Sequence, residues 1–329
     1  MSNNDLDFAS QSTAFWAILV LISLLVVILF ALTFRKHGIV AVTKRLERSI
    51  GLAVPDNLRA LVGRRLLQRR RFALAGTVLA AWAAVPFFGT VGGLQGTGMS
   101  TRMLLLVAAT FAGNAVGTAV GSLRSPARSD DESIRYARPR AVEIGDYVAP
   151  FERRGAWAIV GLAAATLFTS LIFNVSGLVS VPLLPPATIG GLMVLFAATA
   201  LGLFELVGRS IVGRAQPTGS EMEPVWDDQM RAADVRGLAI APVMLGFYGA
   251  LTCGIDLTIA LKQFIDQTVA LIAVNVGGYF GMIVVILIGI FSLVSHPERF
   301  FLRRLWPQYT DLSARLIVGP VADTTGPES

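Results

Sequence analysis

The segment Arg135–Phe168, "RYARPRAVEIGDYVAPFERRGAWAIVGLAAATLF", changes character at one point. Its first part is charged and contains two prolines, whereas no charged residue occurs between Gly155 and Phe168. The apolar run that begins at Gly155 is long enough to cross the roughly 30 Å of hydrocarbon in a bilayer. The segment therefore predicts a membrane-spanning helix preceded by a polar loop.

The composition extends this prediction to the whole chain. Of 329 residues, 54% are hydrophobic and only 15% are charged, whereas soluble domains contain about 25% charged residues. We expect an all-α fold, a polytopic membrane helical bundle of about seven transmembrane helices. The predicted spans are 13–34, 72–92, 103–123, 155–176, 188–208, 237–260 and 268–294.

The positive charges predict the orientation. All 28 Lys and Arg residues except Arg102 and Lys262 fall in segments that alternate crossings place on one side. By the positive-inside rule that side is the cytoplasm, so we expect a multi-pass protein of the cell membrane (the bacterial inner membrane) with its N-terminus outside and its C-terminus cytoplasmic. The first span is too long for a signal peptide. The net charge of +6 then needs no nucleic acid to explain it.

The spacing of arginines suggests a repeated hairpin. Arg71, Arg154 and Arg236 lie 82 to 83 residues apart, and each begins a pair of spans. This pattern indicates one leading helix and three helical hairpins, although hairpins of ordinary length could give the same spacing. The predicted organisation is 1–34 (outer N-terminus and first span), 35–71 (basic cytoplasmic amphipathic segment), 72–294 (six-span bundle with cytoplasmic loops 124–154 and 209–236) and 295–329 (cytoplasmic tail).

The cytoplasmic segments are the predicted docking surfaces. The stretch 38–52 has an apolar and a basic face, as in helices that lie in the membrane plane, and the helix after Pro55 contains six arginines. They favour contact with the lipid bilayer and its anionic headgroups, or serve only as topology anchors. In the middle loop we expect a lipid or protein partner to meet Arg138, Arg140, Asp146 and Tyr147. We also expect the rings of Tyr147 and Phe151 at headgroup level.

A search for catalytic and metal-binding motifs is negative. The zinc-protease, nucleophile-elbow and phosphate-loop patterns are missing from the sequence. His37 and His296 each stand alone, and the spacing of Asp227, Asp228 and Asp234 is not that of a magnesium-diphosphate site. We therefore expect no enzyme activity, no cofactor and no metal.

Polar and small residues inside the spans provide the remaining candidate sites. Asp256, Asn275, Asn174 and Asn114 could line an outward-facing polar cavity for a cation or proton, or form hydrogen bonds between helices. Glu205 is expected to pair with Arg209 one turn later. The glycines Gly113, Gly117, Gly121, Gly277 and Gly281 have the spacing of close helix contacts, within the chain or between two copies.

The phrase from Arg138 to Tyr147, "RPRAVEIGDY", resembles a loop in an uncharacterised family of actinobacterial multi-pass integral membrane proteins. The resemblance implies the same topology and supplies no mechanism. Two functions remain open. One is a non-enzymatic scaffold or sensor that docks lipid or a partner through basic cytoplasmic loops. The alternative is a transporter, channel or permease subunit with a polar cavity around Asp256.

Overall fold

The computed structural model describes residues 37–84, 99–124, 142–177, 189–214, 216, 222–261, 264 and 299–309, together with isolated helical residues between 17 and 31. Every regular element in this part of the chain is a helix. The helices are α2 (His37–Ile50), α3 (Asp56–Ala84), α5 (Met99–Leu123), α6 (Ile144–Tyr147), α7 (Pro150–Val175), α8 (Ile189–Val212), α9 (Glu223–Ala260) and α11 (Phe300–Leu305). The all-helical fold class is as predicted.

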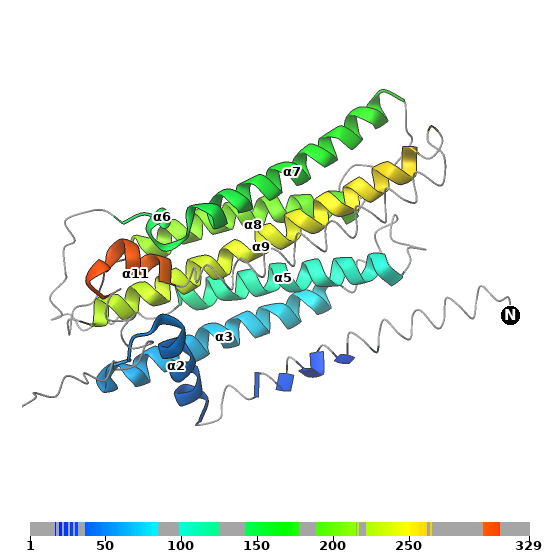
Figure 1. The fold of residues 1–329 in the computed structure, drawn as a ribbon. Helices are drawn as coiled ribbons and strands as arrows, with labels where there is room; N and C mark the ends of the chain where they lie inside the picture. The colour runs from blue at the N-terminus through cyan, green and yellow to red at the C-terminus, as the bar shows by residue number, and fades with distance from the viewer. Residues whose placement is uncertain are drawn as a thin grey trace, which may run out of the picture.

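The five long helices lie alongside one another as a bundle (Figure 1). Helix α3 packs along α5, and α9 packs along both α7 and α8. Helices α7 and α8, the second predicted hairpin, contact each other less than each contacts α9. Their pairing is therefore looser than the hairpin pattern predicts.

In the described part of the chain, four helices are long and apolar enough to cross a membrane. Their apolar stretches are Leu106–Leu123, Pro150–Val175, Ile189–Val212 and Glu223–Thr258, and they correspond to the third to sixth predicted spans. Only the part of the second predicted span up to Ala84 is described, within α3, while the last span, 268–294, and most of the first lie outside the described residues. The structure thus supports a membrane protein with four candidate spans, and seven spans remain a prediction.

Helices α3 and α9 are longer than the apolar runs within them. Helix α9 has 38 residues, or about 57 Å at ~1.5 Å per residue, and its first third is charged. Helix α3 likewise has its arginines in its first half and an apolar second half. The charged segments of α3 and α9 lie at one end of the bundle with α2, α6 and α11 (Figure 1); we call this region the charged end.

Helix α7 presents apolar side chains outward. Leu162, Phe168, Ile172 and Val175 are all more than half exposed. Such side chains are costly in water but are the normal lipid-facing surface of a membrane helix, whose backbone groups are already paired within the helix. This surface agrees with the membrane assignment of α7.

Candidate functional site

The charged end is built on ion pairs between α3 and α9. Arg65 lies 3.0 Å from a carboxylate oxygen of Asp227, and Arg69 lies 2.8 Å from Asp234. Asp227 also binds Arg231 at 2.8 Å, and Arg231 in turn donates to the backbone carbonyl of Val212 at the end of α8. These contacts fix the first turns of α9 to two neighbouring helices.

A buried aspartate joins three further segments. Asp228 is fully buried and accepts hydrogen bonds from the Tyr147 hydroxyl (2.7 Å), the Trp306 indole (2.8 Å) and the amide of Gln216. A buried carboxylate needs such donors to offset the loss of water. Asp228 thus ties α6 and α11 to α9 with charge-assisted hydrogen bonds.

Only Tyr147 and Asp146 of the predicted docking residues in the middle loop are described by the structure. The ring of Tyr147 is buried within the protein and its hydroxyl donates to Asp228, while its position at headgroup level remains a prediction. Asp146 is also buried; it accepts the backbone N–H of Glu143 and the guanidinium of Arg304. A partner cannot reach either residue in this arrangement. Arg138 and Arg140 lie outside the described residues.

A second set of ion pairs connects α7 to its neighbours. Arg236 of α9 pairs with Glu152 at 2.9 Å. The Arg153 guanidinium donates two hydrogen bonds of 2.8 Å to the Glu205 carboxylate of α8, and the Trp157 indole donates to the same carboxylate at 3.1 Å. We call this Arg153–Glu205 contact the clamp. The predicted pair of Glu205 with Arg209 is present at 3.9 Å, but it is the weaker contact.

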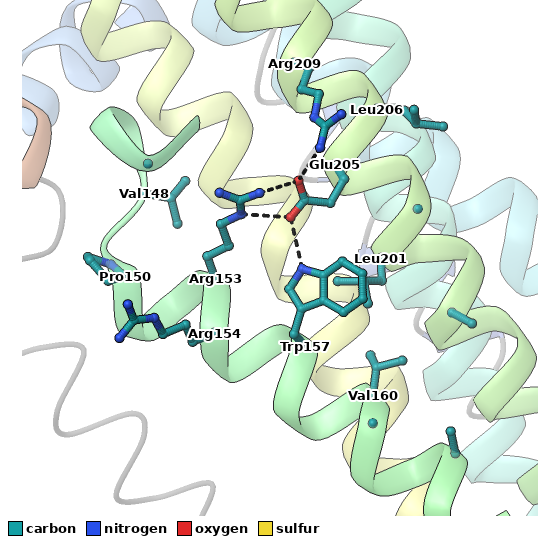
Figure 2. Close-up of a pocket in the computed structure, with 15 residues that line it drawn as sticks. Val148, Pro150, Arg153, Arg154, Trp157, Val160, Leu201, Glu205, Leu206 and Arg209 are labelled. Carbon is teal, nitrogen blue, oxygen red and sulfur yellow. Dashed lines mark hydrogen bonds and ion pairs between the residues drawn. The ribbon is translucent and has the colours of Figure 1, made fainter. Parts of the chain in front are cut away.

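Below this clamp, α7 and α8 border an open groove of about 1000 Å³. Figure 2 shows Arg153, Trp157 and Arg209 directed toward Glu205, Arg154 pointing away from it, and Val160 and Leu201 further along the helices. The lining residues are Gly145, Val148, Pro150, Arg153, Arg154, Trp157, Val160, Gly161, Ala164, Ala198, Leu201, Gly202, Glu205, Leu206 and Arg209. The groove therefore has a charged mouth and an apolar body.

The mouth carries a positive excess. Arg153 and Glu205 neutralise each other, which leaves Arg154 and Arg209 as additional cations. The side chain of Arg209 is 70% exposed, and Arg154 is also exposed. Glu143 lines an adjoining smaller hollow with Arg153 and Arg209 and reduces the excess without cancelling it.

Two glycines give the groove its depth. A Cβ atom at Gly161 or at Gly202 would meet no other atom within 4 Å. Both residues line the groove, one from each helix. The helices present small residues here without using them to approach each other.

The predicted glycine ladder on α5 behaves differently. Gly113 lies against the backbone of Gly76, Gly117 lies against the backbone of Phe72, and Gly121 faces the Phe72 side chain. These glycines form a seam with α3 within the chain. Gly277 and Gly281 fall in the part of the chain that is not described.

The residues of the predicted polar cavity are distributed over different helices. Asn114 on α5 is exposed and donates to the Thr77 hydroxyl of α3 at 3.3 Å. Asn174 lies in the last turn of α7, and Asp256 lies near the end of α9, where it is half-buried. Asn275 is outside the described residues. A common cavity remains a prediction.

Sequence reasoning missed the groove between α7 and α8. Its signal is a stripe at helical spacing, Arg153, Trp157, Gly161 and Ala164, which faces a matching stripe on α8. The sequence predicts only the pairing of Glu205 with Arg209, because the interhelical partner Arg153 is 52 residues away. Comparisons give no further guidance, since no protein-family model, curated protein or solved structure matches the chain.

Proposed function

We propose that this protein is a non-enzymatic membrane scaffold or sensor, and that its charged end docks anionic lipid headgroups or a protein partner. One observation carries the proposal. The carboxylates at the charged end are largely turned inward, into contacts that hold the helices together, while many cations remain on the outside. The exposed cations include Lys44, Arg48, Arg64, Arg70, Arg154, Arg209 and Arg303.

This division of charge favours a negatively charged partner surface. Asp227, Asp234 and Glu152 are each less than one-fifth exposed and are bound to arginines. The exposed arginines then act on lipid headgroups with about 1 kcal/mol of attraction each. A rigid base keeps them in place, since the buried contacts of Asp228 fix α6, α9 and α11.

The proposal includes a topology that places the charged end in the cytoplasm of a bacterial cell, with seven spans and an outer N-terminus. Cysteine accessibility tests it. The only cysteine of the chain is Cys253, so a Cys253→Ala background accepts single cysteines at Ser2 and Ser329. A membrane-impermeant maleimide added to intact cells should label the former and spare the latter; labelling of Ser329→Cys would overturn the topology.

Lipid docking is tested by changing exposed arginines away from the groove. In the variant Arg48→Gln/Arg64→Gln/Arg70→Gln, anionic lipid co-purifying with the protein should fall several-fold relative to zwitterionic lipid, because three headgroup contacts are lost. The matched control is Arg102→Gln, a cation on the predicted outer side. An unchanged lipid ratio, combined with unchanged protein partners in a pull-down, would refute the proposed function.

A further inference from the structure

We propose that the groove between α7 and α8 binds one anionic phospholipid, with its phosphate at the mouth, which Arg154 and Arg209 line, and an acyl chain along Gly161 and Gly202. The inference rests on the proposed function and deepens it, because it replaces general attraction to the membrane surface with one defined site. It is argued from the length of the groove, its charge and its glycines.

The groove has the length and polarity of a lipid in one leaflet. Arg154 and Ala164 are ten residues apart on α7, and Ala198 and Arg209 are eleven apart on α8. At ~1.5 Å per residue the whole groove, charged mouth included, is about 15 Å long, which is half the roughly 30 Å hydrocarbon thickness. Trp157 lies between the charged and apolar parts, at the level where indole rings settle in membranes.

The charges at the mouth select an anionic headgroup. The bidentate bond between Arg153 and Glu205 pairs these two charges and joins α7 to α8 at the mouth. Arg209 keeps a longer 3.9 Å contact with Glu205, and Arg154 lines the groove while pointing away from this clamp (Figure 2). An exposed guanidinium group at the mouth can offer a phosphate the charge-assisted, bidentate hydrogen bonds that this anion favours.

The glycines make room for the acyl chain. Small residues on membrane helices normally allow the helices to come into contact, yet the Cβ positions of Gly161 and Gly202 point into open space. Their helices both belong to the candidate membrane spans. The apolar body therefore opens toward the hydrocarbon, where lipid is the abundant ligand.

Filling the groove tests the proposal. In Gly161→Leu/Gly202→Leu, the new Cβ atoms enter open space, and leucine is a better helix former than glycine, so we expect folding to be retained. The matched control is Gly254→Leu, since its Cβ position on α9 is also open but does not line the groove. Native mass spectrometry of each protein in detergent micelles, with phosphatidylglycerol added, would count the bound lipid molecules.

We expect one tightly bound phosphatidylglycerol in the parent protein and in Gly254→Leu, and at least a tenfold weaker adduct in the filled variant. Arg154→Gln and Arg209→Gln should each weaken phosphatidylglycerol about fivefold and leave phosphatidylcholine unaffected. A filled variant that binds phosphatidylglycerol normally would overturn the site. The site would also be overturned if the filled variant kept its lipid but changed from a dimer to a monomer, since the groove would then be an interface between two copies.

The two proposals fail separately. If Arg48→Gln/Arg64→Gln/Arg70→Gln reduces anionic lipid while the filled variant does not, the proposed function stands and the groove is not its lipid site. If neither variant changes the lipid content, both proposals fall.

Discussion

The bundle uses glycine in opposite ways at two helix pairs. Along α3 and α5, Gly113 and Gly117 bring two backbones into direct contact. Along α7 and α8, Gly161 and Gly202 line an open groove. The difference lies in what surrounds the glycines: a charged clamp spans the mouth of the groove, and α9 packs against both α7 and α8. Glycine spacing alone therefore does not predict whether two helices come into backbone contact.

The sharpest test of this comparison is leucine at Gly117. The new Cβ would collide with the Phe72 carbonyl, and backbone atoms of a packed helix cannot move aside. We expect destabilisation of about 3 kcal/mol or more, at the upper end for overpacked cores, whereas Gly202→Leu should cost nothing or slightly stabilise its helix. Thermal unfolding in detergent, followed by circular dichroism, measures both.

Equal melting temperatures for the two leucine variants would contradict the comparison. The seam between α3 and α5 would then be plastic, and the open groove would no longer be exceptional. A lowered melting temperature for Gly202→Leu alone would reverse the assignment of the two helix pairs.

The sequence predicted the apolar part of this arrangement well. The spans 155–176 and 188–208 agree with α7 and α8 to within five residues at each end, because apolar runs of this length have few other stable forms. The start of α9 was missed: the helix begins at Glu223, well before the predicted span at 237. Charged residues there continue the helix because Asp227 and Asp234 pair with arginines of α3, and such distant partners leave no local signal.

The same reasoning explains which parts of the site escaped prediction. An i,i+4 pair such as Glu205 and Arg209 follows from helical geometry alone. Arg153 and Trp157 reach Glu205 only because α7 and α8 lie at a particular separation. That separation depends on α9, whose position a scheme of three independent hairpins does not contain.

The clamp supplies the second test. Glu205→Ala removes a carboxylate that is only 10% exposed and leaves Arg153, which is 36% exposed, without this partner. We expect a loss of about 1–3 kcal/mol, the range for hydrogen bonds to charged groups. Arg209→Ala removes the 3.9 Å partner, which is 70% exposed, and should cost less than about 0.5 kcal/mol.

Chemical unfolding in mixed micelles would rank these two variants. If Arg209→Ala proved the more destabilising change, the local pair would be the stronger contact and the clamp would not set the helix spacing.

The smallest expected effect is that of Asn114→Ala. Asn114 donates to the Thr77 hydroxyl at 3.3 Å on an exposed part of the seam between α3 and α5. Hydrogen bonds between membrane helices average about 0.6 kcal/mol, and this one is long, so the change should lower stability by no more than that. A loss comparable to that of Gly117→Leu would mean that polar bonding, rather than backbone contact at the glycines, closes the seam. Polar side chains, and not the glycines, would then determine the difference between the α3–α5 seam and the α7–α8 groove.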